Sequence, residues 1–237
     1  SLARVMPGGL RVNWIAPLGI ETEHFLLVAD VPKEIAIEVA IDLENFHAVW
    51  TQIFFPLWKD RQRWDRSQTQ MPNRQTTARV AVPTKMRVLV LRDADQYQLA
   101  LKNEGSQIKQ STGYYSGTLR TTFLLHGARA DQTAASVDEA RATRYHELTH
   151  QLLAEASDSK LRAMPGERAG FWLAEGIACY MESTSIHLGY ATIGGWESSR
   201  LQFARHRVLS LGETTSLDSL QRLGRLQFQR HTDLPSI

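Results

Sequence analysis

The 237-residue chain is long enough for one large domain or for two small ones that share a core. Its apolar fraction of 43% and its charged fraction of 22% are ordinary for a globular protein, and a formal charge of +2 predicts no nucleic-acid partner. The single cysteine, Cys179, excludes an internal disulfide framework and a cysteine-rich zinc site.

Apolar runs and chain ends bear on compartment. No apolar run approaches the roughly 20 residues that a membrane-spanning helix needs, so we expect no transmembrane segment. The chain starts at Ser1 rather than Met, as it would if a targeting segment had been removed. The compartment stays open on this basis, and the expectation leans toward an extracytoplasmic or secreted protein.

At the C-terminal end, the segment around Pro235 predicts that part of the C-terminal lobe lies beyond Ile237.

The first half has the patterns of a small sheet with helices. Compact apolar runs predict strands at His24–Ala29, Lys85–Leu91 and Leu119–Leu125. Apolar residues recur at helical spacing from Lys33 to Phe55, where a proline follows and ends the helix. A short helix is expected from Ala94 to Lys102. Strands followed by helices in this order favour a mixed sheet.

Two stretches of the first half are interpreted as connections. Tyr114–Gly117 indicates a turn that leads into the third strand. Arg61–Arg74 interleaves arginines with glutamines, which is typical either of a basic surface for an anionic partner or of a solvated loop. The loop is the simpler interpretation, because such composition collects in loops.

The second half contains an HExxH motif at residues 146–150, in a run that predicts a helix. Ser136 and Glu139 form a capping-box pattern, which predicts a helix from Ser136 to about Ala156. Two histidines four residues apart return to one helical face after about one turn, so their imidazoles can share a metal ion. Glu147 projects beside them. The alternative is a pair of surface histidines with a solvated glutamate.

A second helical segment supplies a further candidate ligand. Phe171–Ala178 is apolar apart from Glu175, and a charged group is seldom buried without a partner or a metal. Glu175 follows His150 by 25 positions, enough for one helix to end and another to fold back. Two histidines and one glutamate would leave tetrahedral Zn²⁺ one position for water, as in catalytic sites. The alternative is a core glutamate that hydrogen-bonds a neighbouring helix.

The HExxH motif followed by Trp172–Ala178 (WLAEGIA) resembles the gluzincin zinc metallopeptidases, the thermolysin-like and zinc-aminopeptidase-like enzymes. It looks closest to little-characterised bacterial gluzincin-like proteins, and the resemblance covers about Ser136 to Glu182.

For single residues, the resemblance implies that His146, His150 and Glu175 bind one zinc ion and that Glu147 is the general base. It also nominates Glu182 as the partner that hydrogen-bonds a ligand histidine.

The resemblance also bears on the substrate, and it has two departures. In such enzymes the strand before the zinc helix commonly lies along the substrate backbone, which nominates Leu119–Leu125. Cys179 stands where the thermolysin-like pattern has an aspartate, and Ala174 stands where the common motif has an asparagine. Cys179 itself could be a fourth ligand or a reactive thiol, although a small buried residue is the simpler interpretation.

An oxyanion in the transition state would need a further hydrogen-bond donor. The sequence offers six candidates and selects none of them: Tyr114, Tyr115, Tyr180, His187, Tyr190 and His206.

These patterns together predict an α+β protein, a single zincin-like catalytic domain over residues 1–237. Residues 1–130 form a strand-and-helix lobe whose small mixed sheet packs on the active-site helix, and residues 131–237 form a zinc-binding helical lobe. The expected function is zinc-dependent hydrolysis of peptide bonds in a peptide or protein substrate. One alternative is an inactive metal-binding or scaffold protein; a nucleic-acid module that uses Arg61–Arg74 is a more distant one.

Overall fold

The computed structural model of the protein describes residues 10, 12–54, 85–104, 111–126, 134–156, 165–195 and 199–230. The chain divides into two compact units, residues 1–128 and residues 129–237. That these units form one catalytic domain stays a prediction, as does the packing of the sheet on the active-site helix. The arginine-rich stretch at residues 61–74 lies outside the described residues.

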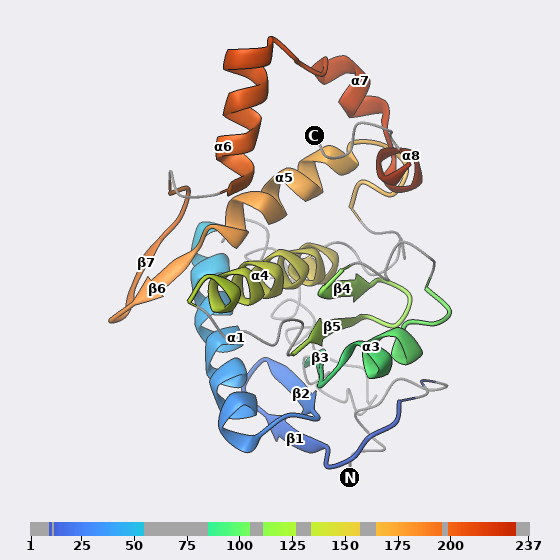
Figure 1. The fold of residues 1–237 in the computed structure, drawn as a ribbon, viewed down its shortest axis with the longest axis vertical. Coiled ribbons are helices and arrows are strands. Elements are labelled where there is room, and N and C mark those ends of the chain that lie inside the picture. The colour runs from blue at the N-terminus through green and yellow to red at the C-terminus, as the bar shows by residue number, and fades with distance from the viewer. Residues whose placement is uncertain are drawn as a thin grey trace, which may run out of the picture. The chain divides into compact units, whose positions relative to one another are not determined.

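Unit 1 contains a five-stranded mixed sheet, which confirms the α+β class (Figure 1). The strand order is β1-β2-β3-β5-β4, and the central strands β2, β3 and β5 are parallel, whereas β1 and β4 pair antiparallel with their neighbours. The strands are β1 (Leu18–Glu21), β2 (Phe25–Ala29), β3 (Met86–Leu91), β4 (Gly113–Ser116) and β5 (Thr121–Leu125).

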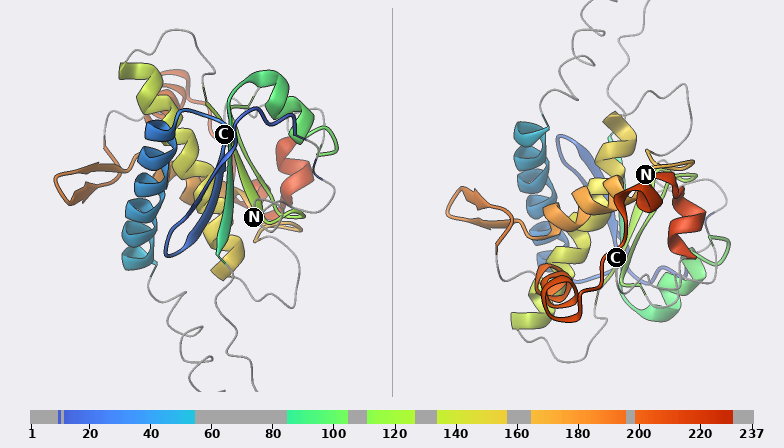
Figure 2. Two further views of the ribbon diagram at one scale, coloured as in Figure 1. Left: turned by 90° about the horizontal axis from the view of Figure 1, so that it is seen from below. Right: turned by 90° about the horizontal axis from the view of Figure 1, so that it is seen from above.

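The helices α1 (Lys33–Ile53) and α3 (Ala94–Ala100) lie on opposite faces of this sheet (Figure 2). Val28 pairs with Leu89, and Leu89 pairs with Phe123 on the next strand. Because side chains alternate along a strand, these three form one row on one face. They belong to a buried apolar cluster that also contains residues of α3. The predicted strands and helices of this half are thus present, with shifts of a few residues at their ends.

The prediction of a turn at Tyr114–Gly117 is wrong for its first three residues. Tyr114 pairs with Phe123 and Tyr115 with Thr122, so the two tyrosines belong to β4. Aromatic side chains suit a pleated, partly buried surface, and here they have cross-strand partners. The turn follows instead at residues 117–120. The sequence analysis also missed β1, a four-residue strand with a weak pattern.

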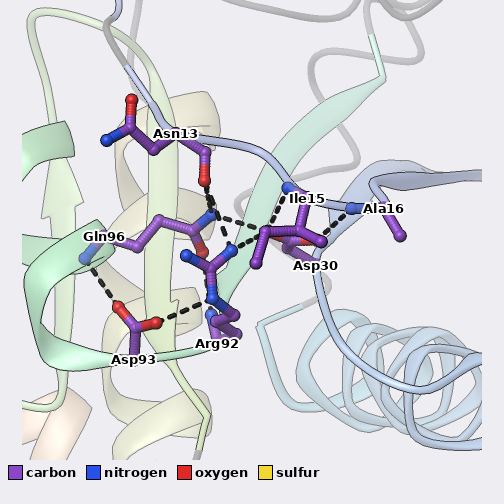
Figure 3. A network of polar contacts seen from close by, with 7 residues as sticks. All are labelled: Asn13, Ile15, Ala16, Asp30, Arg92, Asp93 and Gln96. Carbon is purple, nitrogen blue, oxygen red and sulfur yellow. Dashed lines mark hydrogen bonds and ion pairs between the residues drawn. The ribbon is translucent and has the colours of Figure 1, made fainter.

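A polar network around Asp30 fastens the segment before β1 to the sheet (Figure 3). The Asp30 carboxylate accepts hydrogen bonds from the backbone N–H groups of Ile15 at 3.0 Å and Ala16 at 2.9 Å. The Gln96 amide donates at 2.7 Å, and the Arg92 guanidinium lies 2.5 Å away. Burial raises the pKa of Asp30, but these partners outweigh burial and lower it below its ordinary value.

Unit 2 is mostly helical (Figure 1). Its elements are α4 (Ala134–Ala156), α5 (Phe171–Glu182), β6 (Ser185–His187), β7 (Tyr190–Thr192), α6 (Ser199–His206), the π-helical segment η3 (Arg207–Leu211), α7 (Leu217–Arg222) and α8 (Arg225–Gln229). The long helix α4 packs against α5, and β6 and β7 form a hairpin. Within the described ranges, no helix combines the length and the apolar character that crossing a membrane requires.

The helix predicted from Ser136 to about Ala156 is present as α4, but it begins two residues earlier, so Ser136 lies within its first turn and is not its N-cap. A capping-box pattern marks residues that can cap a helix, and the chain extends this helix by another half turn.

The beginning of α5 is held by α7 and α8. The backbone N–H of Phe171 donates to the carbonyl of Leu223 at 3.2 Å. The Phe171 ring meets the buried ring of Phe228 edge to face, with centroids 5.5 Å apart. Gly224 lies so close to the backbone carbonyls of Glu167 and Arg168 that a Cβ atom there would clash. The C-terminal helices therefore fix where α5 starts.

Candidate metal centre

Helix α4 brings His146 and His150 together one turn apart, as the HExxH spacing predicts. Their ring centroids are 4.9 Å apart with planes at 75°, and the two Nε2 atoms are 3.2 Å apart. Both side chains are almost completely buried. The nitrogens therefore converge on a point between the rings.

Glu175 reaches the same point from α5. Its Oε2 lies 3.3 Å from His146 Nε2 and its Oε1 lies 3.2 Å from His150 Nε2. Zn²⁺ with bonds of about 2.05 Å in a tetrahedral site would hold its donor atoms about 3.3 Å apart. The distances among these three residues fit that requirement, and we name them the converging group: His146, His150 and Glu175.

In the converging group the Glu175 carboxylate contacts both imidazoles, and these contacts shift the pKa values of the group. Burial raises the pKa of Glu175, but its hydrogen bonds to both histidines outweigh burial and hold the pKa well below its ordinary value. Burial lowers the pKa of His146, yet the hydrogen bond to Cys179 and the bonds to two carboxylates raise it well above its ordinary value. Negative charge is thus concentrated where a cation would bind.

Glu182, at the last residue of α5, contacts the other nitrogen of His146. Its Oε2 lies 3.1 Å from His146 Nδ1, so the carboxylate accepts a hydrogen bond from Nδ1, while Nε2 of the same ring lies on the side of Glu175. This is the contact that the sequence analysis assigned to Glu182, and its effect on a bound metal stays a prediction.

His150 is oriented in a different way. Its ring lies parallel to that of Phe171, at 5° and with centroids 6.3 Å apart. Within the described residues, no protein group hydrogen-bonds its buried Nδ1. The Nε2 contact with Glu175 and packing on Phe171 together therefore hold the ring of this candidate ligand.

Arg200 is a contributor that the sequence analysis missed. Its Nε lies 2.7 Å from Oε1 of Glu182, so that a chain of contacts runs from α6 through α5 to His146 on α4. Nothing in the sequence marks this arginine among 27 lysines and arginines, because the link exists only once three helices have packed.

Glu147 lies on α4 between the two histidines and is half-buried. Its negative charge is one of the influences that raise the pKa of His146. It is adjacent to the converging group in the chain, but among the described residues it belongs to no set of possible metal donors.

Cys179 is half-buried rather than fully buried. It forms a possible donor set with His146 and Glu182, within 4.8 Å of one another. Within the described residues, no such set joins Cys179 to His150 or Glu175. The alternative of Cys179 as a fourth ligand to the converging group is therefore not supported.

Unit 1 contains another set of two histidines and a glutamate, which the sequence analysis missed. We name it the stacked group: His24, Glu44 and His47. The two rings lie almost face to face, 3.9 Å apart at 25°. Glu44 holds His24 with both oxygens, at 2.8 Å from the backbone N–H and at 2.7 Å from Nδ1. Burial and the neighbouring His24 lower the pKa of His47 to about 4.

The nomination of Leu119–Leu125 as a substrate-binding strand is wrong. Strand β5 begins at Thr121 and pairs with β3 on one edge and with β4 on the other. A peptide can add to a strand only where a row of backbone groups is unpaired, and β5 has both rows occupied.

The oxyanion donor stays unassigned. Four of the six candidates lie in unit 2: Tyr180, His187, Tyr190 and His206. Tyr180 packs on the turn at Gly194, where a Cβ atom would lie 3.1 Å from its ring. All four are exposed, and the structure does not select among them.

Comparisons with known proteins give no family assignment. No family model matches the chain, and no curated protein or solved structure matches it significantly. The functional argument therefore rests on the residues of the site.

Proposed function

We propose that the chain is a zinc-dependent metallopeptidase with a zincin-like fold that hydrolyses peptide bonds in peptides or proteins. The observation that carries the proposal is the converging group, whose donor atoms are spaced at 3.2 to 3.3 Å. His146, His150 and Glu175 would hold one zinc ion. Two imidazoles and one carboxylate are the ligands of many catalytic zinc sites.

When bound, zinc supplies Lewis acidity toward water and toward a substrate carbonyl group. Two glutamates of the chain would contribute to the reaction in different ways. Glu147 takes a proton from the attacking water and delivers it to the leaving amine, the general acid–base role. Glu182 accepts a hydrogen bond from Nδ1 of His146 and would so leave Nε2 for the ion.

The test of catalysis is Glu147→Gln, which removes the base and leaves all three ligands in place. We expect cleavage of fluorescently labelled casein to fall by at least about 100-fold in kcat/KM, the usual contribution of general acid–base catalysis. Zinc content, measured by mass spectrometry of the metal, should stay at that of the unchanged protein.

Glu139→Gln is the matched control, since it removes a glutamate from an exposed position of the same helix. It should leave both cleavage and zinc content unchanged. Zinc binding without cleavage in the unchanged protein would instead favour the alternative, an inactive metal-binding or scaffold protein. Absence of stoichiometric zinc would contradict the proposal altogether.

A further inference from the structure

Arg200 and His146 use different oxygens of one carboxylate. Arg200 Nε contacts Oε1 of Glu182 at 2.7 Å, and His146 Nδ1 contacts Oε2 at 3.1 Å. The three residues come from α6, α4 and α5. With one partner on each oxygen, the carboxylate cannot rotate without breaking one of the two contacts.

Because the Glu182 side chain is almost completely buried, its contact with Arg200 is important for keeping its carboxylate in place. Its side chain is only 11% exposed, and a desolvated carboxylate needs charged or hydrogen-bonding partners. Among the described residues, Arg200 is the one lysine or arginine that forms an ion pair with it. Without that partner, the Glu182 carboxylate would gain by turning toward water and away from His146.

A second metal ion on this carboxylate is a competing interpretation, because His146, Cys179 and Glu182 could form a donor set. The contact between Arg200 and Glu182 argues against a second metal ion. Its guanidinium already occupies Oε1 and places a fixed positive charge where a cation would have to approach. The geometry is that of a support for His146 rather than that of a second site.

We propose that Arg200 is a positioning residue of the metal centre: it locks the Glu182 carboxylate, which in turn fixes the tautomer and ring direction of His146. The proposal rests on zinc binding by the converging group, and it does not depend on peptidase activity. Arg200 lies outside the converging group and contacts Glu182 instead.

The test is the zinc dissociation constant of the full chain, measured by competition with a chromophoric chelator. We expect Arg200→Ala to weaken zinc binding about tenfold, at the lower end of the 10- to 100-fold that loss of an outer partner costs. Arg200→Lys should recover most of the affinity, because it keeps a positive charge that can pair with Oε1 of Glu182. Arg207→Ala is the control, since that arginine pairs with Glu213 further along the same helical run.

A double-mutant cycle separates positioning from a general loss of stability. In a Glu182→Gln background, Arg200→Ala should weaken zinc binding no further, since the residue through which it acts is gone. An equal loss in both backgrounds, or unchanged affinity in Arg200→Ala, would overturn the positioning role while leaving the zinc site intact. If the unchanged protein binds no zinc, the proposed function fails first.

Discussion

Each unit of the molecule brings two imidazoles and one carboxylate together, yet the two sets differ in geometry. In the converging group the rings meet at 75° with Nε2 atoms 3.2 Å apart. In the stacked group the rings lie 3.9 Å apart at 25°, so the planes that contain their nitrogen lone pairs are nearly parallel. Shared donor types therefore do not make a metal site; convergence of the lone pairs does.

The carboxylates explain much of the difference. Glu175 comes from a second helix and gives one oxygen to each histidine, so it bridges the pair. Glu44 gives both oxygens to His24 and thereby fastens the start of β2 to α1. The first carboxylate completes a set of donors, and the second closes a structural link.

The pKa values of the histidines also differ between the two groups. Burial lowers the pKa of a histidine in both groups, but the hydrogen bond to Cys179 and the carboxylates around His146 reverse that effect. His47 has no such reversal, and its pKa falls to about 4. One histidine pair is thus surrounded by negative charge, and the other contains an imidazole that stays neutral near pH 7.

The largest expected effect is on zinc binding, which we expect at the converging group and not at the stacked group. The unchanged protein should hold one zinc ion per chain. His150→Ala should weaken zinc binding by more than about 100-fold, because loss of a ligand costs more than loss of an outer partner. The measurement is metal content after dialysis, together with chelator competition.

His47→Ala is the matched control for the other group. It should leave one zinc ion per chain, because the stacked group does not converge. A second equivalent of zinc that disappears in His47→Ala would break the comparison and make the stacked group a metal site too.

The next largest expected effect is a change in the free energy of unfolding with pH, caused by His47. In the unfolded chain a histidine titrates near 6.5, whereas His47 in the folded protein titrates near 4. Between these values the unfolded state binds more protons, so the stability contributed by His47 is complete above about pH 7 and is lost as the pH falls. We expect a loss of about 2 kcal/mol at pH 5 relative to pH 8.

Urea unfolding at both pH values, with His47→Gln as the reference variant, isolates this contribution. The variant should be less stable at pH 8 and should show a smaller drop on acidification. An identical drop in both proteins would mean that His47 is not the group responsible.

The sequence was informative where the pattern is local. HExxH spacing on one helix placed His146 and His150 correctly, and a lone glutamate in the apolar run of α5 marked Glu175. Compact apolar runs located β2 and β3 for the same reason, since a short run of apolar residues can be recognised without knowing its neighbours in space.

What the sequence did not predict depends on contacts between distant segments. The arginine at position 200, near the start of α6, meets Glu182 at the end of α5 only in the folded chain, and no local pattern encodes that meeting. His24 and Glu44 lie 20 positions apart on a strand and a helix, with ordinary residue types around them. The strand β4 was missed because its two tyrosines reveal a strand only when β5 lies beside them.

The smallest expected effect concerns Phe171, the aromatic ring that packs on His150. Phe171→Leu removes the parallel aromatic contact, and it also removes the edge-to-face contact with Phe228. Aromatic pairs are worth about 0.5–1.5 kcal/mol beyond their buried area, and only the contact with His150 bears directly on zinc. We therefore expect a roughly threefold weaker zinc affinity, with a lower thermal midpoint. Phe228→Leu should lower the midpoint similarly and change zinc affinity less. Equal losses of affinity in both variants would mean that Phe171 acts through the packing of α5, and not through the direction of the His150 ring.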